Sequence, residues 1–134
     1  MISKKIKFTD YNGNEREETF FFNISKSELI ELELFTEGGY EAMLNRIIET
    51  RDVPKIAQTF KEIIKLAYGR VSPDGTRFVK SEEQTEAFLQ TPAYDSLFVG
   101  FIEHPESFAE FLNGVIPSDL RGQVEALNAE NKNK

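Results

Sequence analysis

The sequence predicts an α+β fold that is mostly α, with an N-terminal β-hairpin packed on a bundle of about five to seven short helices. Two observations carry this prediction. Two alternating apolar segments flank Asn12-Gly13, a dipeptide typical of hairpin turns. From Ser25 onward, apolar residues instead recur at helical spacing, in segments that begin at Ser, Thr or Asp caps and end near glycine or proline.

The register of the hairpin follows from its apolar residues. One set alternates along the first strand (Ile2, Ile6 and Phe8) and another along the second (Phe20, Phe22 and Ile24). A two-residue loop would put these sets on opposite faces. A three-residue loop with Gly13 in the left-handed conformation puts both sets on one face and sets Lys7 opposite Glu17. We therefore expect the three-residue loop, which leaves Phe21 on the polar face.

Cap and stop residues divide the rest of the chain into helices. These run from Ser25 to near Gly38-Gly39, over 40–50, from Asp52 to Ala67 with a stop at Gly69, from Ser81, from Thr91-Pro92 to His104, from Pro105 to Gly114, and from Pro117 through Leu127. Ser25 and Glu28 form a predicted capping box. Between the third and fourth helices, Pro73-Asp74-Gly75 predicts a structured loop with a short extended piece at 77–79.

Length and composition predict one domain. The chain has 134 residues, of which 40% are apolar and 29% charged, and such a chain can bury a core without metals or disulfides. The 12 Phe residues recur throughout, so one core draws on nearly all of the chain. We expect a single globular domain over residues 1–127, with the hairpin at 2–24 and helices at 25–127, followed by a polar frayed tail at 128–134.

Charge and hydropathy narrow the classes of partner. The net charge is −7 and the isoelectric point about 4.8, whereas a nucleic-acid binder needs a basic face. No apolar stretch approaches the roughly 20 residues that a membrane span needs. Neither nucleic acid nor membrane is therefore an expected partner. The absence of cysteine excludes disulfides and fits a reducing cytoplasm.

The residues form no recognisable catalytic or cofactor-binding motif. The single histidine, His104, precedes Pro105 at a helix junction, where a polar surface residue is expected. Acidic residues are abundant on the hairpin (Glu15, Glu17 and Glu18) and on the first helix (Glu28, Glu31, Glu33 and Glu37). Such runs are more often a solvated face than a general acid–base pair. We therefore predict no enzyme, no cofactor and no metal.

Apolar residues outside a simple core pattern are candidates for binding another protein. Phe21 is an aromatic residue on the polar face of the hairpin, which indicates either a contact surface or burial under a neighbouring helix. The first helix has an apolar face that is wide for a surface helix. The predicted protein-binding residues are Phe21, Leu29, Leu32, Leu34 and Phe35.

Segments spread over about residues 4 to 120 carry a resemblance to a known family through their order and spacing. They are Ile6–Glu15, Phe20–Leu29, Gly38-Gly39, the helical region Ile47–Ile64, Tyr68–Phe78, Thr91–Tyr94 and Phe111–Pro117. The Tyr68–Phe78 loop is the most distinctive. In these segments the chain resembles the tail assembly chaperones of long-tailed bacteriophages of Gram-positive bacteria.

The resemblance implies a function. Members of this family bind the long, largely helical tape measure protein, keep it soluble until tail-tube subunits polymerise around it, and then leave. The protein would thus work in the host cell cytoplasm and be absent from the mature virion. The family commonly makes a short product and a frameshift-extended one that recruits tail-tube protein, and this chain would be the short form. Self-association is also expected, because many copies on one filament give avidity.

Three alternatives make different predictions. Another phage structural, connector or interaction protein would be present in purified virions. A small hydrolase would need a deep polar pocket holding two carboxyl groups with strongly shifted pKa values. A transcriptional regulator would need a basic recognition helix, which none of the predicted helices provides.

Overall fold

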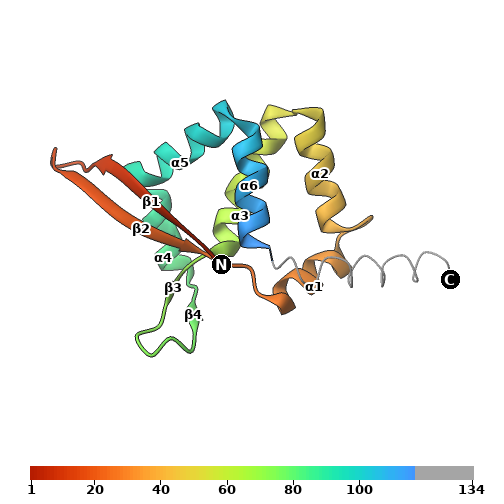
Figure 1. Cartoon of the computed structure of the whole chain (residues 1–134), viewed down its shortest axis with the longest axis horizontal. Coiled ribbons are helices and arrows are strands. Elements are labelled where there is room, and N and C mark those ends of the chain that lie inside the picture. Colours follow the sequence, from red (N-terminus) through yellow and green to blue (C-terminus); the bar gives the residue numbers. More distant parts are fainter. Residues whose placement is uncertain (117–134) are drawn as a thin grey trace.

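The computed structural model describes residues 1–116 and confirms the mostly helical α+β fold (Figure 1). Its strands are β1 (Ile2–Thr9), β2 (Glu15–Phe22), β3 (Tyr68–Val71) and β4 (Phe78–Val79). Its helices are α1 (Lys26–Phe35), α2 (Tyr40–Thr50), α3 (Val53–Ala67), α4 (Glu82–Leu89), α5 (Pro92–Glu103) and α6 (Pro105–Val115). The helix predicted from Pro117 and the tail at 128–134 lie outside the described residues.

The hairpin has the predicted register. Lys7 pairs with Glu17, and Ile2 pairs with Phe22, so both apolar sets share one face. The amide of Asp10 donates to the carbonyl of Asn14 at 2.8 Å, which closes a three-residue loop. Gly13 ends this loop with a φ of 82°, the left-handed conformation that glycine adopts without a steric penalty.

The sheet contains a strand, β3, that the sequence pattern does not predict. The predicted end of the third helix at Ala67 is confirmed, but Gly69 belongs to a strand, because the chain enters β3 directly after the helix. β3 pairs with β2 through Phe21 and Gly69, which makes a four-stranded sheet in the order β1-β2-β3-β4. The predicted extended piece at 77–79 is confirmed in β4, which pairs with β3 through Phe78 and Val71.

The helices begin at the predicted caps. The hydroxyl of Ser25 accepts the amide of Glu28 at 3.2 Å, and the carboxylate of Glu28 accepts the amide of Ser25 at 2.9 Å. This confirms the capping box. The side chains of Asp52, Ser81 and Thr91 likewise accept amides in the first turns of α3, α4 and α5.

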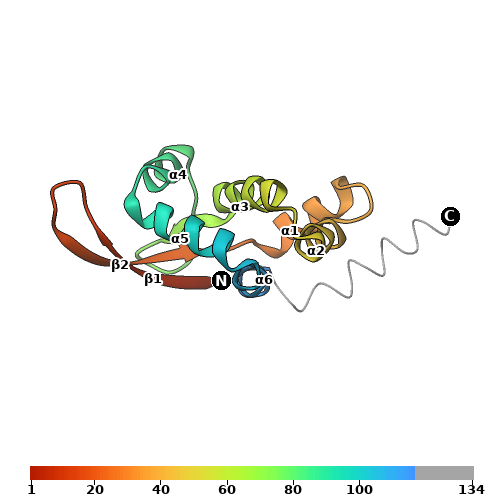
Figure 2. The same ribbon diagram turned by 90° about the horizontal axis from the view of Figure 1, so that it is seen from above.

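One aromatic core joins the sheet to the helices. Phe22 on the inner face of β2 packs against Phe88 of α4 and Phe111 of α6, with ring centroids 5.9 and 5.2 Å apart. Phe60 of α3 continues the cluster towards Phe101 and Phe108. Figures 1 and 2 show the hairpin at one end of the molecule, α3 and α6 in the middle, and α1 and α2 at the other end.

Candidate functional site

The predicted protein-binding residues of α1 divide between its two sides. Leu29 is 1% exposed and belongs to the core, and Leu32 is half-buried against it. The prediction that Leu29 lies on a binding surface therefore does not fit this structure. It arose because both sides of α1 carry apolar residues, and the sequence does not say which side packs inward.

The outer side of α1 ends in exposed apolar residues. Leu34 is 48% exposed and Phe35 is 85% exposed. Exposed Glu31 lies one helical turn before them, and exposed Glu37 follows two residues later. We call Leu34 and Phe35 with these two carboxylates the α1 end patch. It combines an apolar centre with an acidic margin.

Contacts at both ends of α1 hold it against the body. The ammonium of Lys80 donates to both carboxylate oxygens of Glu28, at 2.7 and 2.9 Å. Burial by itself would raise the pKa of Glu28, but the hydrogen bonds from Lys80 and from the amide of Ser25 outweigh it and hold that pKa below its usual value. The ion pair between Glu28 and Lys80 therefore fixes the N-terminal end of α1, and this helps to set which side of the helix faces solvent.

Glu33 provides the second contact and corrects an expectation. Its place in a glutamate-rich helix predicts a solvated carboxylate, but the side chain of Glu33 is only 5% exposed. Its carboxylate accepts the backbone amides of Tyr40 and Glu41 at 3.1 and 2.6 Å, in the first turn of α2. Unpaired amides at a helix N-terminus favour such an anionic acceptor, so Glu33 joins α1 to α2.

Phe21 lies on the outer face of the sheet among other apolar residues. The pairing places Phe21, Gly69, Val71 and Phe78 on the same face. Phe21 and Phe78 are half-buried and Val71 is exposed, while the ammonium of Lys80 lies 5.8 Å from the centre of the Phe78 ring. Phe21 therefore lies in a small apolar strip at a hollow between β2 and β3.

Sequence reasoning named only part of the exposed apolar surface. Within residues 1–116, the other large apolar residues with high exposure are Met1, Tyr11, Val53, Val71 and Val99. Only Val71 extends a predicted candidate, since it shares a face with Phe21. The Pro-Asp-Gly turn, with β-branched and aromatic residues on both sides, could have indicated this second hairpin.

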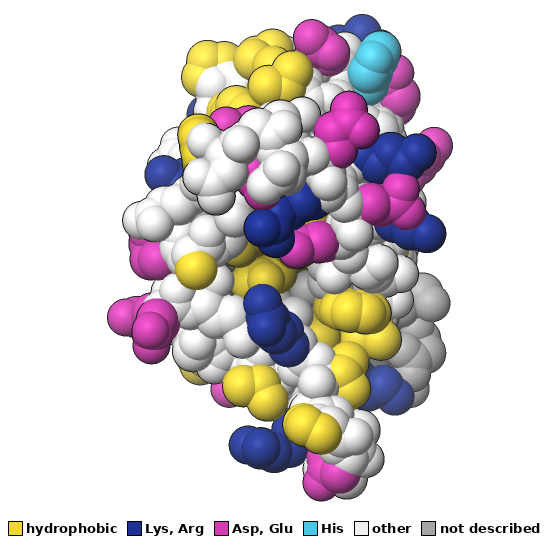
Figure 3. Space-filling view, turned by 90° about the vertical axis from the view of Figure 1, so that its left-hand side faces the viewer, with side chains coloured by type: hydrophobic (Ala, Val, Ile, Leu, Met, Phe, Trp, Pro, Cys, Tyr) yellow, Lys and Arg dark blue, Asp and Glu magenta, His cyan; other side chains and the backbone are white. Residues whose placement is uncertain are grey.

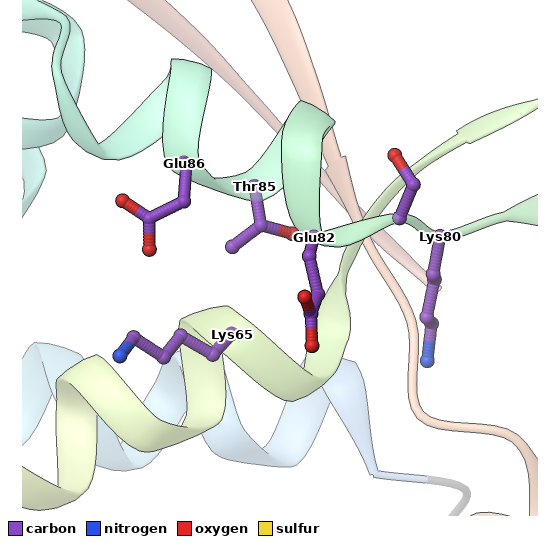
Figure 4. Close-up of a pocket in the computed structure, with 6 residues that line it drawn as sticks. Lys65, Lys80, Glu82, Thr85 and Glu86 are labelled. Carbon is purple, nitrogen blue, oxygen red and sulfur yellow. The ribbon is translucent and has the colours of Figure 1, made fainter.

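A hollow of about 570 Å³ between α3 and α4 is lined by charged side chains. Figure 4 shows Lys65 on α3 and Glu82 and Glu86 on α4 projecting into this space, with Lys80 at its margin. The two lysines and two glutamates in this lining are typical of a solvated groove between two helices. Within residues 1–116, no group of three or more His, Cys, Asp or Glu residues could hold a metal ion.

The surface at the hairpin end of the molecule carries charges of both signs. Figure 3, seen from the hairpin end, shows Lys and Arg interspersed with Asp and Glu, and separate groups of apolar side chains between them. This face offers no continuous basic surface of the kind that phosphate backbones require. Among the described helices, none has the length and apolar character to cross a membrane.

Comparison with known proteins identifies the family. A family model described as phage tail assembly chaperone matches residues 1–134, the whole sequence. No curated protein and no solved structure matches the chain. The full-length match confirms the resemblance to phage tail assembly chaperones and supports a chaperone role in tail assembly, which points to a protein without catalysis. The chain therefore belongs to the phage tail assembly chaperone family.

Proposed function

We propose that the protein binds the tape measure protein of a growing phage tail, keeps it soluble, and helps to recruit tail-tube subunits to it. Two findings support the proposal: the family match and the apolar α1 end patch. A long helical protein exposes apolar stripes before its tube exists, and such stripes aggregate unless another apolar surface covers them.

Phe35 is the observation on which the proposal chiefly depends. An aromatic side chain buries a large apolar area when a partner covers it, and anchors of this kind dominate many interfaces. Phe35 is 85% exposed on a helix whose inner side is fixed by Leu29 and Glu33. It is therefore presented to solvent by a rigid element, which favours binding without a large ordering cost.

Further parts of the proposal concern assembly. The protein works in the host cytoplasm of long-tailed phages of Gram-positive bacteria and leaves before the virion is complete. It self-associates along the tape measure protein, and tail-tube protein is recruited through a frameshift-extended form. Both products can be sought in infected cells, and purified virions should contain neither.

Co-expression tests the central step. The full chain is expressed with the tape measure protein from the same genome, and the soluble fraction of the latter is measured. We expect wild type to raise this fraction and a Leu34→Ser/Phe35→Ser variant to raise it much less. Tyr11→Ser is the matched control, because Tyr11 is an aromatic residue with 82% exposure at the hairpin loop, far from α1.

The outcomes separate cleanly. Circular dichroism and thermal unfolding establish that each variant is folded, which the high exposure of the substituted side chains favours. A tape measure protein that stays equally insoluble with and without wild type contradicts the proposal. A loss caused by Tyr11→Ser as large as that caused by the α1 variant would show that the α1 end patch is not the surface used.

A further inference from the structure

The outer side of α1 has a distinct chemical pattern. Leu29 and Glu33, one turn apart, face the body, whereas Leu34 and Phe35 face away from it. Ile30, half-buried, lies one turn before Leu34 and extends the apolar stripe along the helix. The stripe is thus at least one turn long and can accept a partner with apolar residues at helical spacing.

The margin of this stripe is negatively charged. Glu31 and Glu37 are both exposed, and the last turn of α1 contains no Lys or Arg. The C-terminal end of a helix also carries a partial negative charge from its unpaired carbonyl groups. A ligand that covers Leu34 and Phe35 therefore meets negative potential on the helix and just beyond its end.

We infer that the α1 end patch binds an amphipathic helix whose apolar stripe is flanked by Lys or Arg. The inference deepens the proposed function and rests on it, because it names the chemistry of the partner segment. Apolar contact with Phe35 supplies most of the affinity, and the carboxylates of Glu31 and Glu37 select basic flanks over acidic ones. A partner segment with acidic flanks meets like charges at the same margin.

Two synthetic helical peptides test this inference against the full chain. They share one length and one leucine stripe, and differ only in carrying Lys or Glu at the positions beside the stripe. Binding is measured by fluorescence anisotropy at low and high salt. At low salt we expect the Lys peptide to bind about threefold to tenfold more tightly than the Glu peptide, since exposed ion pairs are weak individually. High salt should reduce this preference.

Charge-reversal variants of the protein provide a stricter test of the peptide preference. Glu31→Lys/Glu37→Lys should invert the preference, so that the Glu peptide binds better than the Lys peptide. The double variant Glu49→Lys/Glu103→Lys changes net charge equally at exposed positions of α2 and α5 and should leave the preference intact. Phe35→Ser should lower the binding affinity for both peptides by at least about fivefold.

Several results would overturn the inference. Equal binding of the two peptides to wild type, or inversion by the Glu49→Lys/Glu103→Lys control, removes the selective role of the acidic margin. If neither peptide binds but Phe35→Ser dissociates a self-associated form, a second copy of the chain covers the patch instead.

The inference and the proposed function can fail separately. If solubility of the tape measure protein depends on Leu34 and Phe35 but the peptides are not discriminated, the function stands and the inference fails. If the peptides are discriminated but the tape measure protein is unaffected by the chain, the patch serves another partner.

Discussion

The buried carboxylate of Glu33 on α1 accepts the backbone amide of Tyr40, the first residue of α2, at 3.1 Å. It also accepts the amide of Glu41 at 2.6 Å, and it does so where the N-cap residue, Gly39, offers no side chain. The side chain of Glu33, seven residues before Tyr40 and eight before Glu41, thus replaces a local N-cap side chain for α2. The orientation of α1, and with it the α1 end patch, depends on this contact.

Substitution of Glu33 tests the contact. Glu33→Ala leaves two amides at the start of α2 without this acceptor, so the free energy of unfolding should fall by about 1–3 kcal/mol. Urea denaturation measures the change. Glu31→Ala, on the exposed side of the same helix, is the control and should stay within about 0.5 kcal/mol of wild type. Equal effects of the two substitutions would contradict the capping role.

Gly69 of β3 lies directly against the ring of Phe78 in β4. A Cβ at this position would lie 2.5 Å from Cε1 of Phe78 and 2.7 Å from the carbonyl oxygen of Val79, so Gly69→Ala forces a shift in β3 or β4. We expect a loss of about 1–3 kcal/mol in thermal or chemical unfolding.

Gly100 supplies the matched control for Gly69. It lies within α5, and a Cβ there would meet nothing within 4 Å. Gly100→Ala should therefore raise stability by about 0.5–1 kcal/mol, because alanine favours the helix. A stable Gly69→Ala variant would show that β3 and β4 do not pack as described.

Local patterns were sufficient to predict the hairpin and the caps. The alternation of apolar residues in β1 and β2 allows one register that keeps both sets together, and the structure has it. Ser25 and Asp52 act on amides three residues later, so short sequence motifs contain the whole interaction. Such elements need no knowledge of the tertiary fold.

Other features depend on contacts between distant residues. β3 is only four residues long and follows α3 directly, so Gly69 had the pattern of a helix stop. Glu33 lies in a helix rich in glutamate, and only the position of the α2 N-terminus explains its burial. The sequence also indicated correctly that α1 is apolar on more than one side. It could not separate buried Leu29 from exposed Phe35, because which side packs inward depends on contacts with the rest of the fold.

Acid titration should report on the loop between β3 and β4. The carboxylate of Asp74 accepts the hydroxyl of Ser72 at 2.6 Å and both the amide and the hydroxyl of Thr76. These hydrogen bonds, the one from Ser72 foremost, lower the pKa of Asp74 from 3.8 to about 2. Because the folded pKa lies below the unfolded one, the stabilising effect is present above pH 3.8 and is lost as the pH falls towards 2.

Substitution of Ser72 checks the cause of that shift. Ser72→Ala removes the largest contribution, so the pKa of Asp74 should rise towards its ordinary value. Carbon-detected NMR of the Asp74 carboxyl group measures both titrations. If the titration of Asp74 is the same in wild type and Ser72→Ala, the hydrogen bond from Ser72 does not stabilise the carboxylate in solution.

Alkaline titration tests the burial of Tyr40 beside acidic residues. Burial first, and then the charges of Glu62 and Glu33, raise the pKa of Tyr40 from 10.0 to about 12. The unfolded chain therefore loses this proton at lower pH than the folded chain, and stability falls as the pH rises from 10 to about 12. The loss attributable to Tyr40 is on the order of 2 kcal/mol over this interval.

Comparison with Tyr40→Phe isolates this contribution, since lysines and other tyrosines titrate in the same range. Urea denaturation at a series of pH values should give a steeper decline for wild type than for the Phe variant above pH 10. Parallel curves for the two proteins would mean that Tyr40 ionises as easily in the folded chain as in the unfolded one. In that case the hydroxyl group of Tyr40 would not be buried beside Glu62 and Glu33, and the packing of α2 against α1 and α3 would have to differ from that in the structure.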